Sequence, residues 1–485
     1  MHKLVIPFLL IFFTCDSNHK NGNWIKTFGG SSLTEIVTQS IDKEGNIIVG
    51  GTYTGEETQF GNTTLSLNGS MNAFLLKFDS FGEQIWLVKF GQNGIVSIQD
   101  IDTDEQGNIY ALLELSKSPL TGEEGEMNFN NSTIKGNGMT PFIVKISKIG
   151  KIEWVQELSN YNYAKFNVVR VWNENLYVGG GSDIVDEFIS KLSDSGPNFL
   201  SGKAIFLKLD LNAKIQKNYI LDGNYLGEIT DMEISNDGKI YLSGNAYCPE
   251  KLTFPFDQDE CLGNIAIDGK QLIFKGYSNG FIAKIENDKF FDLKLIGNDD
   301  YKSHTTRGIT FDKNSNLYIT GSYKVKIQLG NIILNSDKNE SHRIKNNTIY
   351  FTKLDSSLNY VWGLTTKGGS GSDYIWDMLV NNNNQLVVAG DYFEQVNFGE
   401  FSLGKVTEEV GKRGMFIAVI DSNGKYQKVI SDNSEYGSRA INVDTLNDGS
   451  FIISGGVDGK SNLNGIKFGL NKGRNAFVSK ISLFD

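Results

Sequence analysis

One pattern recurs seven times along this chain, at intervals of 62 to 77 residues. An alternating apolar run leads to a small polar turn, and a second apolar run follows. After a variable connection comes a segment with an aromatic residue three positions before a lysine. The first copy reads IVTQSIDKEGNIIVGG and then NAFLLKFDSFGEQIWLVKFG. A repeat of this period indicates stacked units, because one unit cannot bury its own apolar face.

Each copy is interpreted as four strands. Turn sequences such as KEGN, SNDGK and NDGS between the first two strands contain residues that tolerate positive φ in tight hairpins. Four-stranded antiparallel units repeated radially are the blades of a β-propeller. The sequence therefore predicts an all-β fold, a seven-bladed β-propeller with four-stranded antiparallel blades over residues 24–485.

The order of strand types predicts how the two ends of the chain meet. The chain begins with a strand of the fourth type at Trp24–Phe28 and ends with one of the third type at Phe477–Leu483. The seventh copy thus lacks its own fourth strand. We expect the N-terminal strand to close the last blade. Trp24 should then lie where a tryptophan would stand nine residues after Lys480. Such pairing removes two open sheet edges.

The repeat also resembles a known family. The runs that carry the resemblance have the forms DxxGNIYVxG, FVxKxD and WxxxFGG, and they extend over residues 24 to 485. They are similar to those of bacterial β-propeller repeat proteins of exported, cell-surface and lipoprotein type. The resemblance implies the fold, but it implies little about activity, because that family is mostly uncharacterised.

The N-terminus is predicted to lie outside the fold. An apolar stretch at Leu4–Phe13 is too short to span a bilayer and matches a secretory signal. The tetrad FFTC resembles a bacterial lipobox, which implies a signal peptide over residues 1–14 and lipidation of Cys15. Residues 15–23 would then tether a lipoprotein of the bacterial envelope, for which we expect the outer membrane and exposure at the cell surface. A plain secreted protein is the alternative.

Two further cysteines lie in the segment CPEKLTFPFDQDEC. In an exported chain Cys248 and Cys261 can form a disulfide, and two buried thiols are the alternative. A zinc site is disfavoured because no histidine or second cysteine pair stands nearby.

The net charge of −11 and the lack of a basic run argue against nucleic acid and against an anionic membrane surface as partners. We expect a monomer without a cofactor whose partner is a protein or a glycan, and which touches the membrane only through its lipid anchor.

The connections between the second and third strands are long and varied, from 52–72 in the first copy to 457–474 in the last. Variable loops on a rigid scaffold concentrate function, so this face is predicted to bind the ligand. The connections that enter each copy lie nearest the axis, and their aromatic rings and carboxylates suit sugars or cationic groups. Alternatively, each tyrosine covers a blade edge and each aspartate caps a turn. The candidates are Tyr161, Tyr163, Tyr225, Asp299, Asp300, Tyr301, Asp373, Tyr374 and Tyr436.

Two other patterns are interpreted as structural. Asp100, Asp102 and Asp104 precede a hairpin turn, where we expect a solvated hairpin; a Ca²⁺ loop is the alternative, although the EF-hand spacing fails. The lysine of the third strand recurs in six copies. Because a binding site is rarely seven-fold symmetric, these lysines are expected to be outward, strand-flanking charges.

No catalytic signature of the form HExxH, GxSxG or GxxxxGK[ST] occurs. The sequence therefore favours a non-enzymatic cell-envelope binding or scaffold protein. Two alternatives stay open: a propeller enzyme that acts on polysaccharide through paired carboxylates, and an accessory of outer-membrane protein assembly.

Overall fold

The computed structural model describes residues 22–130, 132–136, 138–158, 164–182, 202–248, 262–297, 304–337, 348–368, 373–393, 395–404 and 413–483. These residues form strands, turns and loops, and they contain no helix. The predicted all-β fold is confirmed. In this part of the chain there is consequently no helical segment with the length and hydropathy needed to cross a membrane.

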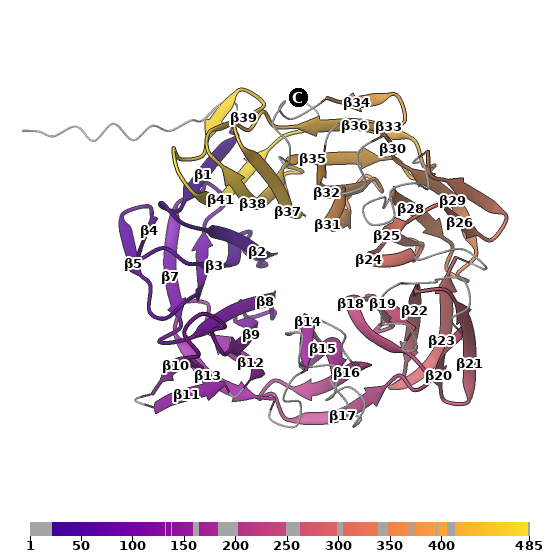
Figure 1. The fold of residues 1–485 in the computed structure, drawn as a ribbon, viewed down its shortest axis with the longest axis horizontal. Coiled ribbons are helices and arrows are strands. Elements are labelled where there is room, and N and C mark those ends of the chain that lie inside the picture. The colour runs from indigo at the N-terminus through magenta and orange to yellow at the C-terminus, as the bar shows by residue number, and fades with distance from the viewer. Residues whose placement is uncertain are drawn as a thin grey trace, which may run out of the picture.

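Most strands belong to four-stranded antiparallel sheets that stand side by side around a common centre (Figure 1). From the centre outward, the first three sheets consist of β2 (Thr34–Ile41), β3 (Ile47–Tyr53), β6 (Asn72–Phe78) and β7 (Gln84–Phe90); β8 (Ile95–Thr103), β9 (Ile109–Ser116), β12 (Met139–Ile146) and β13 (Ile152–Glu157); and β14 (Lys165–Trp172), β15 (Asn175–Ser182), β16 (Lys203–Asp210) and β17 (Ile215–Ile220).

The next three sheets follow the same order. They consist of β18 (Leu226–Ile234), β19 (Ile240–Tyr247), β22 (Ser278–Glu286) and β23 (Lys289–Ile296); β24 (His304–Phe311), β25 (Leu317–Tyr323), β28 (Thr348–Leu354) and β29 (Tyr360–Thr365); and β31 (Tyr374–Val380), β32 (Leu386–Phe393), β35 (Arg413–Ile420) and β36 (Tyr426–Ser431).

A further four-stranded sheet combines the two ends of the chain. It consists of β37 (Gly437–Thr445), β38 (Phe451–Asp458), β41 (Arg474–Ile481) and β1 (Trp24–Phe28). Strand β1 runs antiparallel to β41, and Trp24 lies opposite Lys480. In the first sheet Trp86 lies opposite Lys77 in the same way. The N-terminal strand thus takes the position of a fourth strand, as the order of strand types predicted.

The connections between second and third strands form additional hairpins on one side of the sheets. In the described residues these are β4 (Glu57–Phe60) with β5 (Thr63–Ser66), β10 (Gly125–Phe129) with β11 (Ser132–Gly136), β20 (Leu262–Ile267) with β21 (Lys270–Lys275), β26 (Lys326–Leu329) with β27 (Ile332–Asn335), β33 (Val396–Phe398) with β34 (Phe401–Leu403), and β39 (Ser461–Leu463) with β40 (Ile466–Phe468). The short strand β30 (Lys367–Gly368), from the connection between a fourth strand and the next first strand, pairs with β33.

The apolar core lies between neighbouring sheets rather than within any one of them. Strands β3 and β6 are buried along their whole length, because both faces of each sheet are covered. In one cluster Val49 and Phe74 of the first sheet pack with Ile452 and Val478 of the sheet that contains both chain ends. Burial of such side chains contributes about 1.5–3 kcal/mol each.

The third-strand lysines form part of what we call the outer seam, the contact between the outer strands and turns of neighbouring sheets. Lys77 is only 3% exposed; its Nζ lies 2.7 Å from Oδ2 of Asp42, a hairpin residue of the same sheet, and donates to the carbonyl of Lys148 in the next sheet at 3.5 Å. Lys353 and Asp312 repeat this pair at 3.2 Å. Although burial raises the pKa of Asp42, hydrogen bonds from Lys77 and Asn46 bring it below its usual value. The expectation that these two lysines point outward is wrong, because each neutralises a buried hairpin carboxylate.

Outer-strand tryptophans complete the outer seam. Nε1 of Trp86 donates to the carbonyl of Lys148 at 3.1 Å, and Nε1 of Trp362 donates to that of Ser422 at 3.0 Å, in each case in the next sheet. Gly424 makes room for the second indole: its φ is +84°, and a Cβ atom there would lie 2.9 Å from Trp362 Cδ2. The turn therefore needs glycine for two reasons, left-handed backbone and close approach.

One copy departs from this arrangement. Trp154 packs against the cluster that contains Ala213, which stands where three other turns have Gly82, Gly150 and Gly424 and adopts a φ of 57°. Within the described residues, the buried Nε1 of Trp154 has no hydrogen-bond partner. This part of the outer seam is thus less complete than its counterparts.

Candidate functional site

Each innermost strand contains a β-bulge at the same place. In β2 the register shifts between Ile36 and Thr38, so Val37 has no residue opposite it on β3. A bulge re-aims a side chain and is common beside functional sites. All seven bulged residues line one cavity of about 540 Å³: Val37, Gln99, Asn167, Thr230, Arg307, Trp376 and Ile441. The repeat fixes the position, and each copy places a different side chain there.

Carboxylates follow the bulges toward the hairpin end of the cavity. We call them the axial carboxylate layer: Asp100, Asp102, Asp231, Glu233, Asp377 and Asp444. Four of them bind backbone amides of the next sheet; Oδ2 of Asp102, for example, accepts from Val171 at 2.7 Å. Oδ2 of Asp100 accepts from Val169 at 2.9 Å, and Oδ2 of Asp231 accepts from Ile309 at 3.0 Å. Asp377 accepts from Val443 at 2.8 Å.

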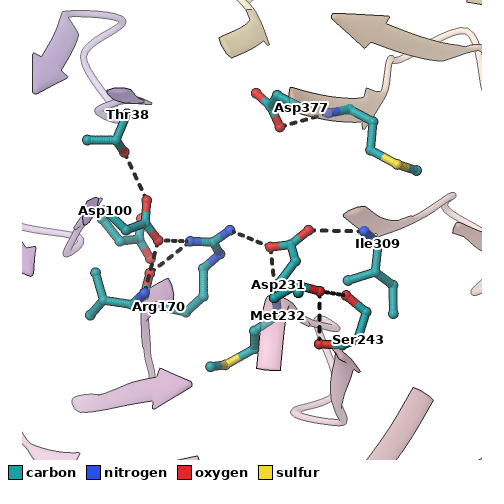
Figure 2. Close-up of polar contacts among 12 residues, drawn as sticks. Thr38, Asp100, Arg170, Asp231, Met232, Ser243, Ile309 and Asp377 are labelled. Atoms are coloured by element: carbon teal, nitrogen blue, oxygen red, sulfur yellow. Dashed lines mark hydrogen bonds and ion pairs between the residues drawn. The ribbon is translucent and has the colours of Figure 1, made fainter. Parts of the chain in front are cut away.

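Arg170 is the cation at the centre of this layer (Figure 2). Its Nη1 lies 2.7 Å from Oδ2 of Asp100, and its Nη2 lies 3.2 Å from Oδ1 of Asp231. The guanidinium therefore joins carboxylates from the two sheets on either side of its own, in addition to the backbone hydrogen bonds.

One arginine does not neutralise all the acids around it. Burial is the main cause that raises the pKa of Asp231 and Asp102 to about 6, while Arg170 opposes the rise. Burial raises the pKa of Asp377 to about 7, and Asp231 adds repulsion. It also raises the pKa of Glu233 to about 8, against the attraction of Arg170. Near neutral pH these acids are therefore protonated more readily than ordinary carboxyls.

The opposite end of the cavity is different in kind. There Arg307 and Trp376 line the cavity, and Tyr374, Asp391 and Arg413 lie against them; we call these five residues the arginine–aromatic mouth. The rings of Tyr374 and Trp376 stack at 5.8 Å. Arg307 lies 5.5 Å from the centre of each ring, and Arg413 lies 5.0 Å from that of Tyr374.

A buried carboxylate holds the mouth in place. Asp391 has no exposed surface; it accepts a hydrogen bond from Nε1 of Trp376 and pairs with Arg413. Trp376 remains 38% exposed. The indole edge is thus fixed from behind, while one part of its surface stays open to the cavity.

The structure changes the interpretation of the Asp100, Asp102 and Asp104 string. Only Asp104 serves the hairpin, where its Oδ1 accepts from the amides of Gln106 and Asn108 at 3.0 and 2.8 Å. Asp100 and Asp102 face the cavity and bind the next sheet, so the expectation of a solvated hairpin is wrong for these two. In the described part of the chain, no group of three or more His, Cys, Asp or Glu side chains could hold a metal ion.

Of the nine predicted ligand residues, one belongs to the mouth, Tyr374. Tyr225 is buried, and its hydroxyl donates to the carbonyl of Leu221 at 2.8 Å. Asp373 is also buried and accepts from the amide of Phe393 at 2.9 Å. Tyr436 is 52% exposed. The other five lie outside the described residues: Tyr161, Tyr163, Asp299, Asp300 and Tyr301.

Sequence reasoning missed the arginines and Trp376. Their common signal is the bulge position, where the seven copies carry seven different side chains. Aligning the first strands of the copies shows a variable column that follows a residue which is apolar in six of the seven copies, Thr306 being the exception. The sequence does not show that this position lines a cavity, because that depends on the bulge in the folded strand.

The predicted lipidation and disulfide remain predictions. Cys15 lies outside the described residues, and so does Cys261. Cys248 follows directly after β19 and is 1% exposed.

Comparisons with known proteins give partial matches in sequence. A family model described as a β-propeller repeat matches residues 293–322. An uncharacterized WD repeat-containing protein of Acanthamoeba polyphaga mimivirus is 22% identical over 213 residues, which cover 42% of this chain and 15% of the viral protein. The chain thus spans less than a fifth of that relative.

Similar solved structures differ strongly in sequence. A Dyadobacter fermentans protein of unknown function aligns over 96% of this chain and 100% of its own, with 7% identity and a TM-score of 0.39. A puromycin hydrolase aligns over 89% of this chain and 59% of its own, with 8% identity and a TM-score of 0.40. A DUF4221 family member from Bacteroides vulgatus covers 76% of this chain and 93% of its own, with 11% identity and a TM-score of 0.32. No activity is transferred from them.

Proposed function

We propose that this β-propeller repeat protein is a non-enzymatic binding module of the cell envelope whose ligand is a glycan held at the arginine–aromatic mouth. The observation that carries the proposal is the partly exposed indole of Trp376. It stacks on Tyr374 and is tied to the buried carboxylate of Asp391.

An aromatic platform of this kind suits a sugar. The apolar face of a pyranose ring stacks on an indole, while its hydroxyls bind polar groups at the rim. The bulged residues Gln99, Asn167 and Thr230 supply amides and a hydroxyl on the same cavity. Because Trp376 lies in a strand and is fixed by Asp391, little side-chain freedom is lost on binding. A cavity of about 540 Å³ is within the usual range for small ligands.

The test is calorimetric titration of the full chain with a panel of bacterial and plant oligosaccharides. Trp376→Ala is expected to weaken binding of the active member by about tenfold or more, since aromatic anchors often dominate affinity. Phe81→Ala is the matched control, because this aromatic side chain is 72% exposed and lies in a turn between a third and a fourth strand. Equal affinities of the two variants would contradict the mouth as the site.

Hydrolysis of polysaccharide by paired carboxylates is the second candidate function. The binding of Asp100, Asp231 and Asp377 to backbone amides favours a structural role for these acids. New reducing ends, produced by the wild-type chain and absent with Asp231→Asn, would instead favour the enzyme. An accessory role in outer-membrane assembly would be favoured by co-purification of assembly proteins from cross-linked cells.

The proposal includes closure of the sheets into one seven-bladed ring. Its support is the pairing of β1 with β41 and the packing of Val49 against Ile452 across the two ends of the chain. Deletion of residues 21–30 is expected to cause aggregation or a much lower melting temperature, because it exposes a sheet edge. A monomeric truncation with wild-type melting would argue against closure.

The proposal also places the protein on a membrane through Cys15. Residues 16–23 span about 28 Å when fully extended, so the module would sit close to the bilayer. Cys15→Ser is expected to release the protein from the membrane fraction, and unchanged fractionation would contradict lipidation. A disulfide between Cys248 and Cys261 is proposed as well; mass analysis after alkylation that counts two free thiols would disprove it.

A further inference from the structure

Four arginines lie in or beside the mouth, although the chain as a whole has a net charge of −11. Besides Arg307 and Arg413 of the mouth, Arg439 lines the cavity, and Arg474 lies beside the lining residue Glu35. Arg439 Nη1 is 3.6 Å from Glu35, which also lies 3.7 Å from Arg474. Arg474 in turn pairs with Asp458 at 3.1 Å.

Carboxylates neutralise three of these four arginines. Asp391 pairs with Arg413, Glu35 with Arg439, and Asp458 with Arg474. In the described part of the chain, Arg307 forms no ion pair. Its contacts are the faces of Tyr374 and Trp376, each 5.5 Å from the guanidinium carbon. Stacking orients the guanidinium and leaves its N–H groups directed away from the rings.

Arg307 is exposed and reaches the cavity from a bulge. Its position therefore combines a cation without a counter-charge, a partly open indole and a second aromatic ring. Guanidinium groups bind carboxylates with two parallel hydrogen bonds, which gives both affinity and orientation. A ligand that fills this place needs an anionic group next to a flat apolar face.

We infer that the mouth is selective for an acidic sugar, a hexuronate whose ring stacks on Trp376 and whose carboxylate binds Arg307. This inference rests on the proposed glycan-binding function and adds the charge of the ligand. A sulfate ester would offer related anionic chemistry, and the experiment below separates the two.

The axial carboxylate layer restricts how such a ligand lies. Asp377 directly follows Trp376 in β31, and it lines the same cavity with Asp100, Asp102, Asp231 and Asp444. A second negative charge deeper in the cavity would be repelled by this layer. The acidic sugar is therefore held at the mouth. The rest of a longer oligosaccharide extends over the face formed by the connections between second and third strands, rather than along the axis.

The experiment is calorimetric titration of the full chain with oligosaccharides of polygalacturonate, alginate and hyaluronan. Each is compared with its carboxyl-reduced, neutral form, and a heparin oligosaccharide is compared with its desulfated form. At least one uronate is expected to bind about tenfold more tightly than its neutral form. Its affinity is expected to fall as salt rises. If affinity follows sulfate instead of carboxylate, the hexuronate assignment is overturned.

Three variants locate the charge. Arg307→Gln is expected to lose about tenfold in affinity for the uronate and nothing for the neutral form. Arg307→Lys is expected to lose less, because it keeps the charge without the planar fork. Lys313→Gln is the control, since this exposed lysine lies on a hairpin between a first and a second strand. Melting temperatures of all three show whether each variant is folded.

The outcomes separate the two proposals. If neutral and acidic forms bind equally, and Trp376→Ala weakens both, the glycan function stands and the acidic selectivity is wrong. If Arg307→Gln binds the uronate as tightly as the wild type, the assignment of the carboxylate to Arg307 is wrong. If no oligosaccharide binds, both the selectivity and the glycan function are overturned.

Discussion

Two polar regions of this protein, the outer seam and the axial carboxylate layer, use charge in opposite ways. At the outer seam a buried lysine neutralises a hairpin aspartate of its own sheet and reaches a carbonyl of the next sheet, as with Lys77 and Asp42; Lys353 and Asp312 repeat the pattern. At the axial carboxylate layer, acids such as Asp377 bind backbone amides and crowd one another. The pKa values of Asp42 and Asp312 are consequently lowered, mainly by hydrogen bonds that outweigh burial, whereas burial raises those of axial acids such as Asp231 and Asp377.

The difference between the two regions shows which positions of a repeat protein can differ between copies and so form a ligand site. Positions of the outer seam recur between copies, as with the two lysine–aspartate pairs and the tryptophans Trp86 and Trp362, because they perform the same structural task. The bulged position of the innermost strands differs in every copy, from Val37 to Trp376. It lies where the sheets converge on one cavity. A ligand site with its own chemistry fits this variable position better than the regular seam.

Breaking an outer-seam pair should give the largest effect. Lys77→Met leaves Asp42 buried without its counter-charge and is expected to reduce the free energy of unfolding by about 3 kcal/mol or more. Chemical denaturation at pH 7 measures the loss. Lys43→Met, which breaks the exposed pair of Lys43 with Glu105, should cost less than about 1 kcal/mol. Similar losses in both variants would contradict the role of the outer seam.

Removing the cation of the axial layer should have a somewhat smaller effect. Arg170→Met is expected to cost about 2–3 kcal/mol at pH 8, less than for a fully buried pair because the Arg170 side chain is 26% exposed. Arg170 lowers the pKa of Asp231, so its loss makes ionised Asp231 less favourable. The cost should therefore be smaller at pH 5 than at pH 8. Arg307→Met, in the mouth, should change stability by less than about 1 kcal/mol; an equal loss would erase the distinction between the two layers.

Glu233→Gln tests the raised pKa values directly. A carboxyl whose pKa rises on folding contributes stability below its unfolded pKa, near 4.5, and loses it as the pH rises toward its folded pKa, here about 8. From this group, the wild type should lose stability between pH 5 and pH 8. The variant should lose less, by roughly 1–2 kcal/mol. Urea unfolding at both values measures the difference, with the exposed Glu105→Gln as control. Parallel pH dependences of wild type and Glu233→Gln would refute the prediction.

The smallest expected effect is a gain at the incomplete part of the outer seam. Ala213→Gly relieves a left-handed residue and should raise the free energy of unfolding by about 1 kcal/mol. The converse change, Gly424→Ala, should destabilise by more than this, because a Cβ atom there meets Trp362. Thermal unfolding of both variants provides the measurement. A stabilising Gly424→Ala would show that the contact with tryptophan does not constrain these turns.

The regular features of the fold could be predicted from the sequence. The hairpin turns, the four strands of each copy and the place of Trp24 opposite Lys480 follow from local patterns and from strand order. The sequence also showed which connections are long, those between second and third strands, because loop length can be counted directly. Of the site, only Tyr374 was anticipated among the described residues.

The remainder depended on tertiary structure, for two physical reasons. A bulge shifts the alternation of side chains along a strand by one residue. The two-residue alternation in the sequence therefore does not predict that Arg307 and Trp376 line the cavity. Charge pairing also acts across long separations: Lys77 meets Asp42 from another strand, and Arg170 meets acids of two other sheets. The sequence by itself determined the repeating scaffold, because its turns and apolar strands are local. Only the convergence of sheets decided which side chains share a cavity and which charges are neutralised.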